Sequence, residues 1–147
     1  MRPAKTQSDL RRRKVCPSTA IAAAIIGSIC LTPSPSAAAE SAPPDQVALS
    51  TLDEIVRGDY PAASADFNPT MQSLLPVQAL QQSWDLYQQA FGAYLSHGVP
   101  ENVQRDDVTV VNVPLQMARR PGQFRVSVQP DGTLSALTFL REGVPVP

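Results

Sequence analysis

The sequence predicts an α+β fold in which N-terminal helices pack on one face of a curved, four-stranded antiparallel sheet. Up to Phe91 the apolar residues recur every three or four positions, which is the helical period. After Gly92 they recur every two positions, which is the period of a half-buried strand. Residues 1–39 have a different composition from the rest, so we assign the domain to residues 45–147, with 40–44 as a short lead-in.

Residues 1–39 have the composition of a secretory signal peptide. They hold six of the twelve Lys and Arg residues, followed by an apolar run of 12 residues from Ala20 to Leu31. Such a run suits a signal-peptide core and is shorter than the roughly 20 residues that span a bilayer. Small residues follow, and we expect cleavage between Ala39 and Glu40. The mature protein is then expected to be secreted or held at the cell envelope, with no stable membrane span.

Three other interpretations of the leader stay open. A lipoprotein would be acylated at Cys30, although the bulky Ile29 before it does not suit that modification. An uncleaved anchor is disfavoured by the short apolar run. The run Arg12–Val15 partly resembles a twin-arginine signal, but basic residues begin all such leaders, so we favour the general secretory route. Cleavage would remove Cys16 and Cys30, and with them any disulfide or cysteine-based metal site.

The helical part contains four expected helices. They span residues 45–57, 59–66, 68–75 and 76–90, with Asp45, Asp59 and Asn68 placed to cap the first three. Gly58 and Gly92 suit the ends of the first and last helices. The last helix has the strongest pattern, an apolar stripe made by Val77, Leu80, Trp84, Tyr87 and Phe91. Burying such side chains contributes about 1.5–3 kcal/mol each, so this helix must pack on the rest of the domain.

The strand part is expected to form an antiparallel meander. Its strands span residues 93–104, 108–118, 123–129 and 133–141. The first should be irregular around Gly98–Pro100. Pro114 within the second suggests a sheet edge or a bulge, because proline donates no ladder hydrogen bond. Turn residues separate the later strands at Arg119–Gly122 and Pro130–Gly132.

Several local patterns resemble the bacterial family called domain of unknown function 3887. Leu80-x3-Trp84, followed by Phe91–Tyr94, resembles the central helix and first strand of that family. Val111–Leu115 resembles its second strand and Asp131–Leu137 its closing hairpin. The matching stretches are residues 53–67, 80–94 and 108–137. The resemblance implies a cone-like fold similar to nuclear transport factor 2 and the ketosteroid isomerases, and it transfers no catalytic residue.

A fold of this kind has a pocket between its helices and its sheet. The candidates to line it are the aromatic residues Tyr60, Trp84, Tyr87, Phe91 and Tyr94. Isomerase-like chemistry would need a carboxylate base and a tyrosine oxyanion donor, which Asp59, Asp66 or Asp85 with Tyr60 or Tyr94 would supply. However, Asp85 falls on the polar side of its helix, whereas Asp59 and Asp66 suit helix caps. The aromatic stripe is more simply explained as core, so we disfavour an enzymatic role.

No other residue cluster has the composition of an active site. His97, the only histidine, is expected to be a surface or hydrogen-bonded residue rather than a general base. It has no second histidine with which to hold a metal. The acidic pair Asp106-Asp107 falls short of the six or more oxygen ligands that Ca²⁺ takes. We therefore expect no metal and no cofactor.

Charge excludes two classes of partner. Residues 40–147 contain six Arg, no Lys and twelve Asp or Glu, which is a formal charge of −6. Nucleic-acid affinity comes largely from basic contacts to phosphate, and anionic membranes also attract basic segments. The sequence therefore predicts a non-catalytic module that binds an unknown protein or small-molecule ligand. Two alternatives stay open, a small cone-fold enzyme with a pocket Tyr/Asp pair and a structural module that forms a homodimer.

Overall fold

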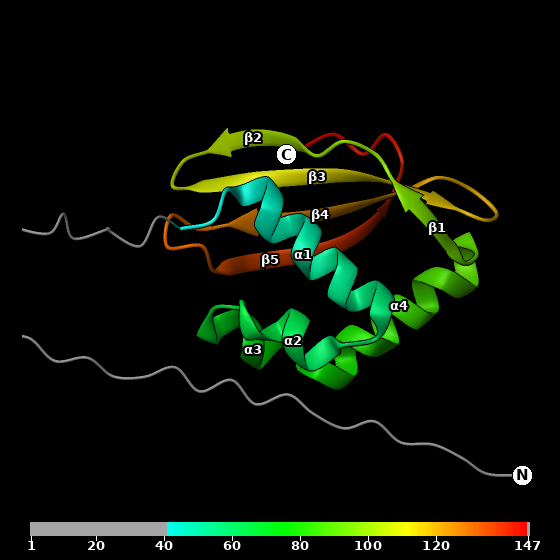
Figure 1. Cartoon of the computed structure of the whole chain (residues 1–147), viewed down its shortest axis with the longest axis horizontal. Coiled ribbons are helices and arrows are strands. Elements are labelled where there is room, and N and C mark those ends of the chain that lie inside the picture. Colours follow the sequence, from blue (N-terminus) through cyan, green and yellow to red (C-terminus); the bar gives the residue numbers. More distant parts are fainter. Residues whose placement is uncertain (1–40, 147) are drawn as a thin grey trace, which may run out of the picture. The chain divides into compact units, whose positions relative to one another are not determined.

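The computed structural model describes residues 41–146, so the expected signal peptide, its cleavage site and Cys30 lie outside this range. Within it, four helices come first and five strands follow (Figure 1). The helices are α1 (Pro44–Arg57), α2 (Tyr60–Ala65), α3 (Pro69–Leu74) and α4 (Val77–Phe91). The strands are β1 (Tyr94–His97), β2 (Glu101–Arg105), β3 (Val108–Met117), β4 (Gly122–Val128) and β5 (Leu134–Arg141). The predicted α+β class is confirmed.

The sheet is open, and its neighbouring strands are antiparallel. Their order is β1-β3-β4-β5, and β2 pairs with β3 on the same side as β1. The strand expected over residues 93–104 is therefore two strands, and the sheet has five strands in the described range instead of four. Pro114 gives the physical reason. It lies inside the sheet and not at an edge. Its backbone nitrogen, which has no N–H to donate, faces the gap between β1 and β2. Its carbonyl faces the same gap and accepts the Gly98 N–H at 2.8 Å.

Local side-chain chemistry sets most of the helix ends. Asn68 and Asp59 cap α3 and α2 as predicted, since their side chains accept backbone N–H groups at 2.8 and 3.3 Å. Gly58 ends α1 with a left-handed φ of 80°, also as predicted. The expected cap at Asp45 is wrong. α1 begins one residue earlier, at Pro44, because proline has a helical φ and lacks the N–H that a first-turn residue leaves unpaired.

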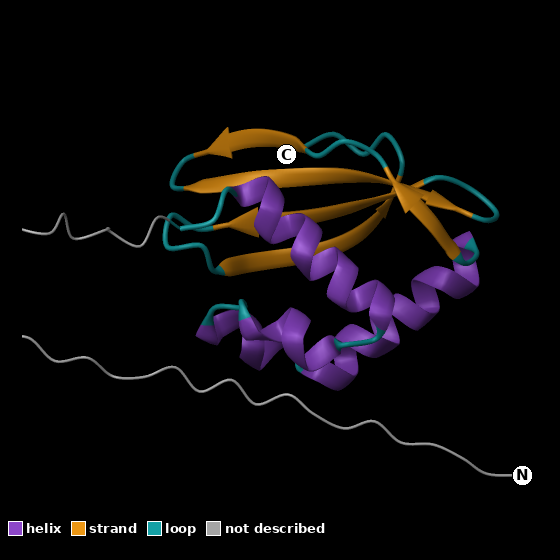
Figure 2. Cartoon of the chain, in the orientation of Figure 1, coloured by secondary structure: helices purple, strands orange, loops and turns teal. Residues whose placement is uncertain are grey.

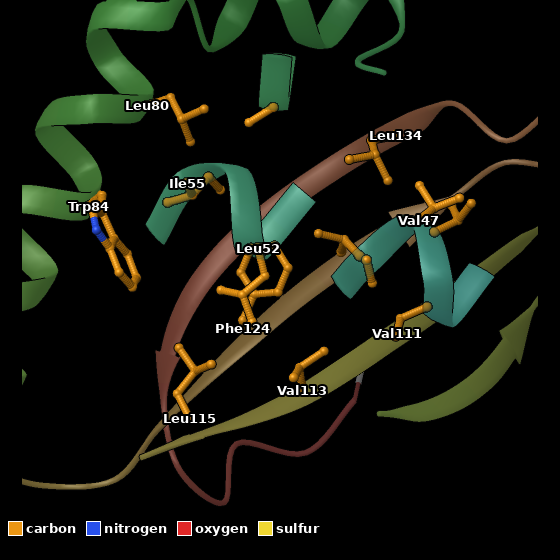
Figure 3. Packing of buried hydrophobic residues seen from close by; sticks show 14 of the residues in the cluster. Val47, Leu52, Ile55, Leu80, Trp84, Val111, Val113, Leu115, Phe124 and Leu134 are labelled. Atoms are coloured by element: carbon orange, nitrogen blue, oxygen red, sulfur yellow. The ribbon is translucent and has the colours of Figure 1, made fainter. Parts of the chain in front are cut away.

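The core lies between the helices and one face of the sheet. Figures 1 and 2 show α1 lying across the strands, with α2 and α3 below β5 in this view and α4 running from there to the start of β1. Figure 3 shows the side chains of Leu52 and Ile55 of α1 on the sheet face that carries Val113 and Phe124. The sheet contributes the alternating residues that its period predicts: Val111, Val113, Leu115, Met117, Phe124, Val126 and Val128. None of the helices in residues 41–146 is both long and apolar enough to cross a membrane.

Candidate functional site

Aromatic side chains fill the space between α4 and the sheet. Trp84 is only 2% exposed, and its ring centroid lies 5.1 Å from that of Phe139 and 5.9 Å from that of Tyr87. Phe139 also lies 5.3 Å from Tyr87 and 5.7 Å from Phe124. These are ordinary packing distances for aromatic pairs. The centre of the domain is therefore occupied by its own side chains.

The hydroxyl of Tyr87 is inserted between two strands. It donates to the carbonyl of Leu140 at 2.7 Å and accepts the N–H of Gln123 at 3.0 Å. Gln123 and Leu140 are opposite each other in β4 and β5, so the hydroxyl links the two strands through a side chain. Gly122 leaves room for it, because a Cβ there would overlap the hydroxyl. Burial raises the pKa of Tyr87, which keeps the phenol protonated and able to donate.

Tyr60 and Tyr94 are half-buried at the margin of the aromatic cluster, where the ring centroid of Tyr94 lies 6.3 Å from that of Trp84. Burial, and then the charge of Asp85, raise the pKa of Tyr60. Burial, and then the charge of Asp53, raise the pKa of Tyr94. Neither phenol makes a hydrogen bond to a carboxylate within residues 41–146, and the carboxylate of Asp59 is used as the α2 cap. The described structure therefore holds no assembled pair of tyrosine donor and carboxylate base.

Glu54 has a partly buried carboxyl group. Its Oε2 atom is buried and has no hydrogen-bond partner among the described residues. Burial, followed by repulsion from Asp66 and Asp59, raises the pKa of Glu54. Residues 41–146 contain no group of three His, Cys, Asp or Glu side chains placed to hold a metal ion. His97 is exposed, and its Nδ1 lies 2.9 Å from the carbonyl oxygen of Gly98.

One surface feature that can receive a partner is a groove between α4 and β5, which we call the α4/β5 groove. It has a volume of about 390 Å³. Its lining residues are Leu75, Ser83, Leu86, Tyr87, Ala90, Phe91, Leu137, Thr138 and Phe139. Leu86 is 63% exposed although it is a large apolar side chain. Two of the predicted pocket residues, Tyr87 and Phe91, thus line this groove, and Trp84 packs beneath it against Phe139.

One wall of the groove is the outer edge of β5, the side that faces away from β4. Backbone groups of successive strand residues alternate between the two sides of a strand. The Leu140 carbonyl faces β4, where it accepts the Tyr87 hydroxyl, so the N–H and C=O groups of Leu137 and Phe139 face outward. Near its start the edge is covered, because Leu134 makes two backbone hydrogen bonds with residues 66–68. Beyond that point, no described segment pairs with it.

The two edges of the sheet differ in a way that is relevant to binding. The opposite edge consists of two short strands with a break between them, a bulge between Tyr94 and Ser96, and charged ends at Glu101 and Arg105. Short, charged and interrupted strands are how proteins prevent unwanted strand pairing. The β5 edge carries no charged residue from Leu134 to Leu140. It is therefore the edge that is chemically able to accept another strand.

A family model described as protein of unknown function (DUF3887) matches residues 48–137. The chain belongs to this family. The match confirms the resemblance found in the sequence, and it runs from α1 into β5, so it includes all of α4 and the first half of β5, the two elements that form the α4/β5 groove. No curated protein and no solved structure matches the chain.

The DUF3887 domain also holds α4 in place through two residues that the sequence predicted only as part of the turn at Arg119–Gly122. Arg119 donates to the carbonyl of Gln89 at 2.8 Å, and Arg120 donates to that of Ala90 at 3.1 Å. Cations at a helix C-terminus satisfy its unpaired carbonyls and the helix dipole. The Arg120 guanidinium also lies 4.7 Å from the centre of the Phe91 ring. In the sequence, the only sign of this interaction is a pair of arginines directly after a strand. That pair does not indicate which helix end lies near it.

Proposed function

We propose that this DUF3887 domain is a protein-binding module that takes up an extended segment of a partner along the β5 edge. The observation that carries the proposal is the α4/β5 groove, in which an uncharged strand edge lies beside exposed apolar side chains of a helix. An added strand would lie about 4.8 Å from β5 and would pair with the outward groups of Leu137 and Phe139. Its inward side chains would then cover Leu86 and Phe91.

The groove also defines the kind of segment that fits. Successive side chains of a strand point to opposite faces, so apolar residues are needed only at every second position of the partner. The backbone of β5 supplies hydrogen bonds of no particular sequence preference, and the apolar wall supplies the selectivity. We further propose that the protein acts after export through its leader and that its fold is of the nuclear transport factor 2 type. Helices over one face of an open sheet support the latter.

A second copy of the chain is the alternative occupant of the same edge. Two β5 strands can pair antiparallel about a two-fold axis, which is the commonest symmetry of homodimers. The low charge of Leu134–Leu140 favours this as much as it favours a foreign strand, since no like charges would meet. The role would then be structural, and the experiment below separates the two.

The test begins with hydrogen exchange of the full chain at low concentration. The amides of Leu137 and Phe139 should exchange quickly, whereas the amide of Thr138, which faces β4, should be protected. A displayed library of seven-residue peptides is then selected on the protein. Peptides with alternating apolar residues should be enriched, and they should slow exchange at Leu137 and Phe139.

Two matched variants provide the control. Leu86→Lys places a charge in the groove, whereas Leu95→Lys changes a leucine on β1 that is similarly exposed, 66% against 63%. We expect the selected peptides to lose about tenfold or more in affinity for the first variant only, because an added ammonium must be desolvated by the bound strand. Equal binding to both variants would refute the proposal. Protection that grows with protein concentration and needs no peptide would favour the homodimer.

A further inference from the structure

The sheet carries a group of polar side chains on the face opposite the helices. After β5 the chain turns at Gly143, whose φ is 81°, and residues 144–146 return over this face. Register pairs place Asn112, Gln123 and Arg125 on the same face, since their neighbours in β3 and β4 belong to the helix-facing core. A space of about 310 Å³ is left between the returning segment and the sheet.

Side chains of the sheet hold the returning segment by its backbone carbonyls. Arg125 donates to the carbonyl of Val144 and, at 3.0 Å, to that of Pro145. Gln123 donates to the Val144 carbonyl at 3.4 Å, and Arg105 donates to the Val146 carbonyl at 3.2 Å. The sheet thus binds three consecutive carbonyls, and each hydrogen bond is made to the main chain and not to a side chain.

Two of these donors, Gln123 and Arg125, are also hydrogen-bonded to the side chain of Asn112. Gln123 is 4% exposed and Asn112 is 9% exposed, and the two amides are hydrogen-bonded to each other. The Asn112 oxygen also accepts from Arg125 at 3.4 Å. Neither Arg105 nor Arg125 forms an ion pair with a carboxylate of the described chain. Both cations direct their N–H groups to carbonyl oxygens, which is a charge-assisted hydrogen bond.

We propose that this face is a second binding site, for an extended, proline-containing peptide segment of a partner protein, which residues 143–146 occupy within the chain. The segment Gly143-Val-Pro-Val146 has no charged side chain, so the sheet holds it through its backbone carbonyls and its small apolar side chains. Proline favours an extended backbone whose carbonyls point outward and lowers the entropy lost on binding. A partner peptide of the same kind would make the same contacts after displacing residues 143–146.

The site is separate from the α4/β5 groove and can be tested separately. The shortened chain ends at Glu142 and therefore lacks the occupant but no residue of the core. The probe is a fluorescein-labelled, amidated peptide with the sequence of residues 142–146. We expect it to bind the shortened chain one-to-one and at least about tenfold more tightly than the full chain, because a tethered occupant competes at a high effective concentration.

Arg125→Ala in the shortened chain should weaken peptide binding by at least about tenfold, because that residue supplies two of the carbonyl contacts. Arg141→Ala is the matched control, since it removes a neighbouring cation that donates no hydrogen bond to residues 142–146 in this structure, and it should leave affinity unchanged. If the shortened chain fails to fold, Gly143→Val in the full chain serves instead. A β-branched residue is strained at a φ of 81°, which should release the segment and raise peptide affinity.

Three results would overturn the proposal. The peptide could fail to bind the shortened chain or the Gly143→Val chain. It could bind the Arg125→Ala and Arg141→Ala chains equally well. The full chain could form dimers that disappear on shortening, in which case the site takes the segment of a second copy and not a partner peptide. None of these results bears on Leu86→Lys, so the groove proposal stands or fails by its own experiment.

Discussion

Replacing Tyr87 by phenylalanine removes one oxygen atom from the point where β4 and β5 are joined through a side chain. The Tyr87 hydroxyl bonds to Gln123 at 3.0 Å and to Leu140 at 2.7 Å. Without it, the Gln123 N–H and the Leu140 C=O lose the hydroxyl as a hydrogen-bond partner. Each unsatisfied group costs about 1–3 kcal/mol, so we expect Tyr87→Phe to lower the free energy of unfolding by about 2–4 kcal/mol.

The assay is urea unfolding of the full chain, followed by the fluorescence of Trp84, which packs against Tyr87. Tyr60→Phe is the control, because it removes the same atom from a half-buried phenol that makes no hydrogen bond with a described residue. A surface change of that kind costs within about 0.5 kcal/mol. Equal losses in the two variants would refute the inserted-hydroxyl interpretation. They would mean that β4 and β5 close up and form the direct hydrogen bond.

Gly122 gives an independent check of the same geometry. A methyl group at this position overlaps the Tyr87 hydroxyl, so Gly122→Ala alone should destabilise the domain by about 1–3 kcal/mol, the usual range for overpacking. Combining it with Tyr87→Phe removes the overlapping oxygen. The double variant should therefore lose less stability than the sum of the two single losses. Simple additivity would show that the two positions do not meet.

Three further predictions concern residues outside this junction. Glu54→Gln should raise stability at neutral pH. Burial, and then repulsion from Asp66, raise the folded pKa of Glu54 above its ordinary value of 4.5, so the native state holds extra protons and wild-type stability falls as pH rises through that window. Asn68→Ala should cost about 0.5–2 kcal/mol, because Met71 loses its capping acceptor. Gly92→Ala should cost at least about 1–3 kcal/mol, since φ is 91° and a Cβ would lie 2.8 Å from the backbone nitrogen of Arg119, in the turn that follows β3.

Chemical denaturation measured at several pH values checks all three variants together. The Glu54→Gln chain should show a flatter dependence of stability on pH above 4.5 than the wild type, and a parallel pair of curves would contradict the assignment. Asn68→Asp is the control for the cap, because aspartate caps as well as asparagine and loses only the Asn68 Nδ2 hydrogen bond to Gln129, so it should lose less stability than Asn68→Ala. Gly58→Ala is the control for Gly92, since its φ is 80° but its Cβ would meet no atom within 4 Å. A loss at Gly92 no larger than at Gly58 would show that strain alone, without the close contact, accounts for the effect.

Features that depend on near neighbours in the chain were determined by the sequence alone. The caps at Asp59 and Asn68 bond to residues three positions away, and Gly58 ends its helix through its own φ. The change from a period of 3.6 to a period of two also follows from residues within one element. Asp45 shows the limit of this reasoning, because two signals, an acid and a proline, competed over one helix start. The helix begins at the proline, Pro44.

Features that depend on distant partners were decided only by the tertiary structure. Tyr87 meets Leu140, which is 53 residues away, and no local pattern distinguishes an aromatic residue that packs from one that also joins two strands. The break opposite Pro114 divided into two a segment that the sequence predicted as one strand with an irregularity around Gly98–Pro100. Which strand lies at the uncharged edge of the sheet depends on strand order, and strand order follows from the sum of all core contacts. Periodicity assigns a residue to a face of its own element, but the neighbour on that face is chosen by packing, and so the α4/β5 groove became visible only in three dimensions.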